Sequence, residues 1–224
     1  MNSQLQRQTL DELIHKGRYL YPTDVVNIIE RFHSVEGPGV PRAVITAYVD
    51  EFIRRLGPRA PFSQDRFARL LDGRVADLDM WLPHTIYEVA PGRVSVFPPT
   101  WHRLLAGVHD PAQYVGVIGE DLAAAKGVGT GESLPPVPKQ VLIDAMMVLG
   151  GLDRRTAGGF IKQARLNGRL VVEPFQNPNA SVWLPTPNSG HSKPQQLNRP
   201  DRPLPDDPND TRRDSASIRP KYRR

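Results

Sequence analysis

Six histidines are the residues of this chain whose chemistry could most readily support metal binding or acid–base catalysis. They are His15, His33, His84, His102, His109 and His191. No two of them have the i, i+4 spacing around a glutamate that places zinc ligands on one face of a helix. His102 and His109 are seven residues apart, with Gly107 interrupting a helix between them. We therefore expect no metal site.

Other patterns that could do chemistry are equally incomplete. The close acidic groups, Glu120-Asp121 and Asp77 with Asp79, are expected to be solvated. Residues 127–131, Gly-Val-Gly-Thr-Gly, look like a phosphate-binding loop, but no Lys-Ser/Thr pair follows and no strand precedes, so we interpret them as a linker. No serine occupies a nucleophile elbow, and the absence of cysteine excludes thiol chemistry and Cys-based zinc sites. We predict a protein that is not an enzyme and has no cofactor.

The most informative segment, residues 151–172, predicts a turn, a capped helix and a strand. Asp153 can accept hydrogen bonds from the first backbone N–H groups of the helix. Gly168 is placed to end it in a left-handed conformation. The apolar positions recur at helical spacing and define a buried face: Ala157, Phe160, Ile161 and Ala164. We expect Phe160 and Ile161 to pack against Leu142 and Met146, which belong to a helix over residues 138–149.

The opposite face of this helix is small and basic. Glycines inside a helix cost about 1 kcal/mol each relative to alanine, and two of them adjoin basic side chains here. Their absence of side chains would let another surface approach the backbone closely, either a nucleic acid or another helix. The residues that we expect to contact DNA are Arg154, Arg155, Thr156, Gly158, Gly159, Lys162 and Arg165.

This segment resembles a known family. The order Asp153…Thr156-Ala157…Ile161…Ala164…Gly168-Arg169-Leu170 is similar to the recognition helix and first wing strand of winged helix-turn-helix proteins, although Arg169 replaces the first of an apolar pair. The resemblance covers roughly residues 110–185, at the level of the superfamily. It implies a recognition helix at about 153–167, a wing at about 169–184 and binding to double-stranded DNA.

The N-terminal half predicts a second unit of helices followed by a hairpin. Helices are expected at residues 9–16 and 23–33, after Pro41, and after Ser63 with Phe67, Leu70 and Leu71 facing inward. A weakly helical stretch (75–82) precedes a hairpin at 85–97, whose Pro91-Gly92 suits a type II turn. Residues 74–81 make a poor recognition helix because Asp77 and Asp79 would repel phosphate. We interpret this unit as a dimerisation or partner-binding module, whose apolar third helix is either its core or a dimer interface.

Charge and composition set the predicted boundaries. The net charge is +5, yet residues 1–138 hold 14 Lys/Arg against 16 Asp/Glu, whereas residues 139–169 hold 6 against 2 and residues 186–224 hold 9 against 5. Clustered positive charge of this kind favours phosphate backbones. From residue 186 the chain is rich in proline and has little to bury, so a disordered tail is expected. The predicted domains are 1–107, 108–185 and 186–224.

The sequence therefore predicts a mainly α fold with short β-hairpins: tandem winged helix-turn-helix modules and a disordered tail. We expect a DNA-binding protein, either a transcriptional regulator or a replication or maintenance accessory factor, with a homodimer formed through the N-terminal module. The alternatives are a protein–protein adaptor without nucleic-acid binding and, third, a nuclease or processing enzyme with a dispersed site. No segment is apolar enough to span a membrane, and the polar start lacks a signal core, which favours a cytoplasmic protein.

Overall fold

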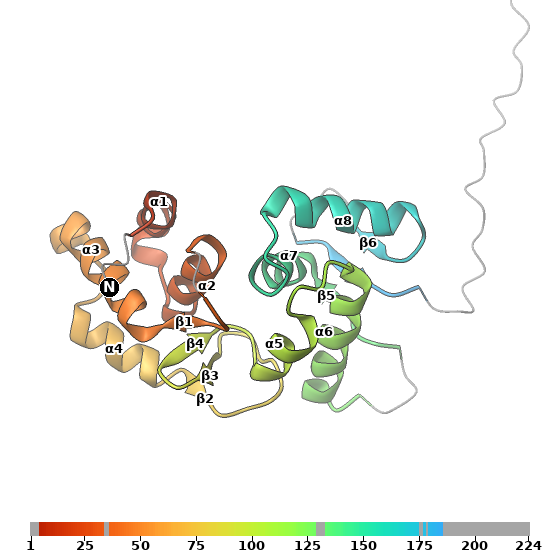
Figure 1. The fold of residues 1–224 in the computed structure, drawn as a ribbon, viewed down its shortest axis with the longest axis horizontal. Coiled ribbons are helices and arrows are strands. Elements are labelled where there is room, and N and C mark those ends of the chain that lie inside the picture. The colour runs from red at the N-terminus through yellow and green to blue at the C-terminus, as the bar shows by residue number, and fades with distance from the viewer. Residues whose placement is uncertain (1–4, 34–35, 129–132, 175–176, 178, 186–224) are drawn as a thin grey trace, which may run out of the picture. The chain divides into compact units, whose positions relative to one another are not determined.

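The computed structural model describes residues 5–33, 36–128, 133–174, 177 and 179–185. Among these residues, pairs of helices are separated by short strands, and the whole described region belongs to one compact unit (Figure 1). The α-helices are α1 (Arg7–Lys16), α2 (Pro22–Phe32), α3 (Arg42–Leu56), α4 (Gln64–Asp72), α5 (Pro99–Leu105), α6 (Pro111–Lys126), α7 (Lys139–Val148) and α8 (Arg154–Leu166). The strands are β1 (Val40–Pro41), β2 (Val75–Ala76), β3 (Ile86–Ala90), β4 (Arg93–Ser95), β5 (Val137–Pro138), β6 (Val171–Glu173) and β7 (Ser181–Trp183). Two short 3₁₀ turns cover Gly17–Tyr19 and Gly57–Arg59.

Two halves of the described chain repeat one topology. In the N-terminal half the order is α2–β1–α3–α4–β2–β3–β4, and in the C-terminal half it is α6–β5–α7–α8–β6–β7, so the two differ only by the extra strand β2. The sheets correspond as well, with strand orders β1-β4-β3-β2 and β5-β7-β6. In each half the short first strand therefore lies beside the last strand, which in turn pairs with its hairpin partner.

The repeat is also visible in the residues of the first strands. Val40-Pro41 is followed by Arg42 at the start of α3, and Val137-Pro138 by Lys139 at the start of α7. Both valines are fully buried and pair with a buried valine, Val94 or Val182. Because proline lacks an N–H group and has a fixed φ, it ends the strand and begins the helix in both places. We call residues 22–95 and 111–183 the N-terminal and C-terminal repeats.

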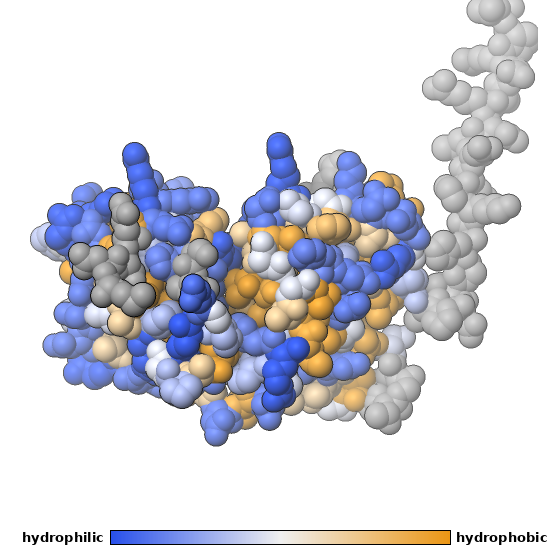
Figure 2. Space-filling view, viewed as in Figure 1, coloured by the Kyte–Doolittle hydropathy of each residue, from blue (hydrophilic) through white to orange (hydrophobic). Residues whose placement is uncertain are grey.

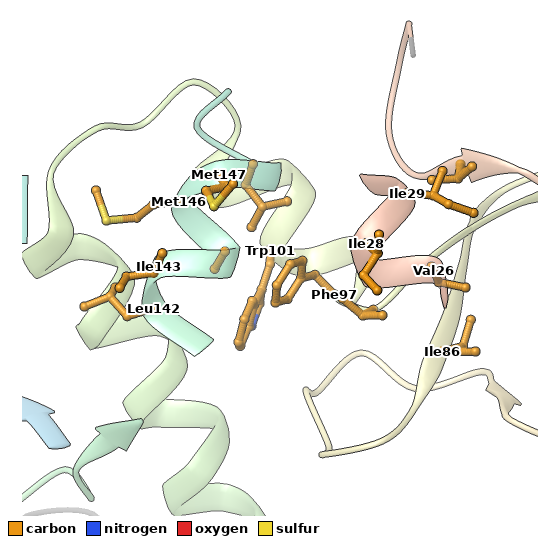
Figure 3. Packing of buried hydrophobic residues seen from close by; sticks show 14 of the residues in the cluster. Val26, Ile28, Ile29, Ile86, Phe97, Trp101, Leu142, Ile143, Met146 and Met147 are labelled. Carbon is orange, nitrogen blue, oxygen red and sulfur yellow. The ribbon is translucent and has the colours of Figure 1, made fainter. Parts of the chain in front are cut away.

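The two repeats share one hydrophobic core at α5. Trp101 is fully buried and stacks on Phe97 at 5.4 Å and on Trp81 at 5.7 Å between ring centroids. Figure 3 shows Phe97 and Trp101 between Ile28 of α2 and the side chains of α7. Burial of large aromatic rings is a major favourable term in folding, so this junction holds the repeats together.

Several expectations about the N-terminal half are confirmed. The hairpin forms as β3 and β4, and Gly92 has the positive φ (+69°) that its turn needs. Ser63 accepts a hydrogen bond from the N–H of Arg66 at the start of α4. The apolar residues of α3 are largely buried within the chain, as the core interpretation of this helix requires.

Other expectations about the N-terminal half are wrong. Residues 75–82 form the short strand β2 and a loop instead of a helix, so α4 is the last helix before the hairpin. Leu70 is 41% exposed, because Phe67 and Leu71, four residues apart, already define the inward face of α4. Asp121 is half-buried instead of fully solvated: its Oδ2 accepts from the Trp81 N–H (2.7 Å) and the Trp101 Nε1–H (2.8 Å).

The proposed tail, residues 186–224, and most of the proposed linker, residues 127–131, lie outside the described residues. None of the described helices is both long and apolar enough to cross a lipid bilayer. Figure 2 shows apolar surface gathered over α5, α6 and α7, whereas the surface over α3 and α4 is mostly hydrophilic.

Candidate nucleic-acid interface

The helix that the sequence singled out, α8, begins at a strong cap. One Asp153 carboxylate oxygen accepts from the N–H groups of Arg155 (2.9 Å) and Thr156 (3.0 Å), and the other accepts from the Thr156 hydroxyl (2.6 Å). These bonds, the one from the hydroxyl first, hold the pKa of Asp153 below its usual range. Gly168 has a φ of +69° just beyond the helix. The predicted start and end of this helix are confirmed.

One face of α8 is anchored in the core. Ala157, Ile161 and Ala164 are 0%, 1% and 5% exposed. Their spacing places Arg155, Gly159 and Lys162 on the opposite side, where all three are exposed. Figure 1 shows α8 as the outermost helix of the C-terminal repeat, above α7 and β6.

The other four predicted contact residues differ in exposure and in their hydrogen bonds. Arg154 is exposed, and its Nη2 donates to Gln140 Oε1 at 2.9 Å. The Thr156 side chain is exposed but already bonds to the cap. Gly158 and Arg165 are half-buried at the edges of the exposed face. The geometry therefore gathers Arg155, Gly159 and Lys162 as the open centre of this surface, which we call the α8 face.

The expected burial of Phe160 is wrong. This side chain is 39% exposed, and its ring stacks on His109 with centroids 6.0 Å apart. Phe160 lies at the border of the apolar stripe, because Ala157, Ile161 and Ala164 form the middle of that stripe and Phe160 flanks it. Leu166, 61% exposed, is a second exposed apolar residue of α8 and lies four residues after Lys162, on the exposed side of the helix.

The glycines of α8 meet no neighbour in the described part of the chain. A methyl group built on Gly158 or Gly159 would have nothing within 4 Å, apart from the helix's own backbone. Close packing against another helix within this repeat, one of the two explanations that the sequence left open, is therefore not what these glycines provide. Their cost in helix stability, about 1 kcal/mol each, is not offset by any contact of the described residues.

A chain of polar contacts links α8 to the N-terminal repeat. Asp144, on α7, is 7% exposed and accepts from Arg31 Nη1 (3.1 Å), Asn27 Nδ2 (3.2 Å) and Gln140 Nε2 (2.7 Å). Gln140 in turn accepts from Arg154. The contacts thus run from α2 through α7 to the first turn of α8. Sequence periodicity could not reveal them, because Asn27 and Arg31 lie more than a hundred residues from Asp144 in the chain.

A second group of polar residues, which no sequence pattern indicated, lies near α5. His102 Nε2 and Ser95 Oγ are 2.9 Å apart, the spacing of a base and a nucleophile. Ser95 has no exposed surface, however, and its hydroxyl also bonds to Glu30 and to the Phe97 N–H. The carboxyl group thus contacts the serine instead of the imidazole, so the order of groups differs from a catalytic triad.

Metal binding finds no support among the described residues. No group of three or more His, Cys, Asp or Glu side chains comes together there in a way that could hold an ion. His102 lies beside Ser95, whereas His109 stacks on Phe160 and contacts the Gly150 carbonyl at 3.1 Å. The two histidines therefore contact different parts of the fold and do not form a common site.

Comparisons with known proteins give no further assignment. No protein-family model matches the chain, and no curated protein or solved structure is significantly similar to it.

Proposed function

We propose that this protein binds double-stranded DNA through the α8 face, as a winged helix-turn-helix protein that acts in transcription or in DNA replication or maintenance. The observation that carries the proposal is the combination of Arg155, Gly159 and Lys162 on the exposed side of a helix whose other side is anchored in the core. Arginine and lysine neutralise phosphates and release counterions. A glycine between them lets the backbone approach a groove wall closely.

The topology of the C-terminal repeat supports this proposal. A helix, a short strand, two helices and a hairpin, with the sheet order β5-β7-β6, is the arrangement expected of one winged module. In such a module the helix before the hairpin enters the major groove and the hairpin flanks it. The helix at this position is α8.

A comparison of the repeats indicates why α8, and not α4, would bind DNA. The two helices correspond from their caps, Ser63 and Asp153, onward, since buried residues follow each cap at four and eight positions. Two residues after the cap, α4 has Asp65 and α8 has Arg155. Nine residues after the cap, α4 has Asp72 and α8 has Lys162. Carboxylates at these positions would repel phosphate, and Asp72 is already paired with Arg42 at 2.5 Å.

The test is duplex DNA binding by the full chain across a range of salt concentrations. Replacing Arg155 and Lys162 together by alanine is expected to weaken binding to all sequences and to lower the salt slope by about one for each phosphate that is no longer neutralised. The matched control replaces Arg66 and Arg69 of α4 by alanine and is expected to leave affinity nearly unchanged. Equal affinity of the α8 variant and the parent would refute the proposal.

A third variant, Gly159→Ala, separates DNA contact from helix stability in the same assay. Alanine fits sterically and favours the helix, so the protein should become more stable by about 0.5–1 kcal/mol. Its DNA affinity should nevertheless decrease, because the added methyl group holds the groove wall away from the backbone. A more stable variant with unchanged affinity would show that the glycine serves no close approach.

One observation favours the alternative of a protein–protein adaptor. Phe160, at the edge of the α8 face, and Leu166, at its C-terminal end, are 39% and 61% exposed. Exposed apolar side chains mark a protein-docking surface where they belong to a contiguous patch, and Phe160 and Leu166 would supply its apolar contacts. Salt distinguishes the two functions, since retention on DNA should fall steeply with salt, whereas apolar docking should not.

A further inference from the structure

Two exposed tyrosines lie two residues apart in the segment that joins α1 to α2. Tyr19 and Tyr21 are 69% and 63% exposed, which makes them the two most exposed large apolar side chains of the described residues. Leu20, between them, is 5% exposed and belongs to the core. Because successive side chains of an extended segment point to opposite sides, the two tyrosines share the outer side. We call Tyr19 and Tyr21 the tyrosine pair.

The backbone that carries the tyrosine pair is held in place. The Leu20 N–H donates to the Gly17 carbonyl (3.3 Å), and the Tyr21 N–H donates to Asp24 Oδ2 (3.0 Å) at the start of α2. Leu20 has an extended conformation, with φ −82° and ψ 120°. An extended chain rises about 3.3 Å per residue, so the two tyrosines leave the backbone about 6.6 Å apart.

This spacing suits one planar aromatic ring between the two side chains. Stacked bases of a nucleic acid are about 3.4 Å apart, so two rings separated by about twice that distance leave room for a single base. A base inside a duplex is already stacked on its neighbours, whereas an unpaired base has both faces open. Aromatic side chains are a common means by which proteins hold unpaired bases.

A positive charge lies beside the tyrosine pair. Arg18 Cζ is 5.0 Å from the centre of the Tyr19 ring, and Arg18 Nη2 donates to the Tyr19 hydroxyl at 2.8 Å. Arg18 is exposed, so its guanidinium group is accessible to a phosphate. Asp24, the carboxylate at the start of α2, is paired with Lys16 at 2.5 Å. A strand with one base between the tyrosines would therefore place a phosphate next to Arg18.

We propose that the tyrosine pair binds an unpaired base of a single-stranded nucleic acid, with the base between the two rings and a backbone phosphate beside Arg18. Such stacking tolerates any base, since every base has an aromatic face. The site does not depend on the proposed binding of duplex DNA by α8. Together with the α8 face, it would direct the protein to DNA in which a single strand adjoins a duplex.

The test is fluorescence anisotropy of a labelled oligothymidine of about ten nucleotides, titrated with the full chain. Replacing both tyrosines by alanine is expected to weaken binding about fivefold or more, the loss that follows removal of a stacking ring. Both side chains are exposed, so this variant should fold as the parent does. Replacing both by phenylalanine keeps the rings and should leave affinity nearly unchanged. Equal affinity of the alanine variant and the parent would overturn the proposal, as would an equal loss in the phenylalanine variant.

Two controls separate base stacking from other sources of affinity. Leu104→Ala removes a comparably exposed side chain (59%) from α5 and should bind as the parent does. A duplex of the same length offers no unpaired base, so the double alanine variant should bind it as the parent does. An equal loss for the duplex and the single strand would contradict base stacking.

Oligouridine of the same length shows which sugar the site accepts. Binding that depends on the tyrosine pair, for either oligothymidine or oligouridine, supports the proposal, and the strand with the larger loss identifies the preferred nucleic acid. Absence of a tyrosine-dependent loss for both strands would overturn it.

Discussion

Burial shifts the pKa values of Glu30 and His102 in opposite directions, because it disfavours the charged form of both groups. It favours the protonated, neutral form of the carboxyl group and raises its pKa from 4.5 to about 7. It also favours the neutral form of the imidazole, which lowers the pKa of His102 from 6.5 to about 4. Both groups meet at the Ser95 hydroxyl, so the fold keeps this small polar cluster largely uncharged.

These shifts predict two opposing contributions to the pH dependence of stability. Glu30 binds its proton more tightly when folded, so its contribution is full below pH 4.5 and is lost as the pH rises towards 7. His102 releases its proton more readily when folded, so its contribution is full above pH 6.5 and is lost as the pH falls towards 4. Each contribution is of order 3 kcal/mol, and in the parent the two largely cancel.

Single variants should expose each contribution in urea unfolding measured across this pH range. Glu30→Gln is expected to gain stability relative to the parent as the pH rises from 4.5 to 7, because the parent alone buries an ionising carboxyl group. His102→Gln should gain relative stability as the pH falls from 6.5 to 4. Parallel pH profiles for the parent and both variants would contradict this account.

At the scale of the element, α8 divides its side chains between two surfaces. Ile161 is 1% exposed and belongs to the core, whereas its neighbour Phe160 is 39% exposed and contacts mainly His109. Sequence periodicity alone assigned both to the core. The structure gives them different energetic roles, although the two residues are adjacent and both apolar.

Alanine substitution should therefore separate these neighbours. Ile161→Ala is expected to lower the free energy of unfolding by about 2–5 kcal/mol, because it leaves a cavity in a packed core. Phe160→Ala should cost only about 1 kcal/mol, the worth of an aromatic contact at a partly exposed site. Chemical denaturation measures both, with Leu166→Ala as the exposed control. A larger loss for Phe160→Ala than for Ile161→Ala would reverse the assigned orientation of α8.

At the scale of the whole described region, the buried pair Arg31–Asp144 connects the two repeats. Both side chains are 10% exposed, and their charged atoms are 3.1 Å apart. Such a pair contributes less to the free energy of unfolding than its short distance would indicate, because removing two charges from water is costly. Its main effect is to penalise any arrangement of α2 and α7 that leaves one charge unpaired.

Breaking the pair from one side should therefore be far more damaging than replacing it. Asp144→Ala leaves the guanidinium of Arg31 buried without its partner, and we expect a loss of about 3–5 kcal/mol in the free energy of unfolding. The double variant Arg31→Met with Asp144→Leu should lie much closer to the parent. Urea unfolding of the three proteins tests this difference, and equal losses for the single and double variants would show that the pair has no such role.

The sequence by itself determined most of the helices and both hairpins, but it predicted neither α5 and α6 nor the short strands β1, β2 and β5. The cap at Asp153, the left-handed Gly168, the hairpin at Pro91-Gly92 and the helical spacing around Ile161 are local features, which act within a few residues. Local rules are therefore sufficient to locate α8 and its basic exposed side. They failed for residues 75–82, where strand pairing of Val75-Ala76 with β3 outweighs a weak helical tendency.

Only the tertiary structure decided which side chains at the borders of these elements are buried and which distant residues meet. Phe160 is 39% exposed and stacks on His109 at the border of the core, and Asp121 is half-buried where two tryptophans donate to it. The contacts of Glu30 with the Val96 N–H and of Arg31 with Asp144 join segments 66 or more residues apart. No local pattern encodes such contacts, since they form only when separate elements pack and exclude water.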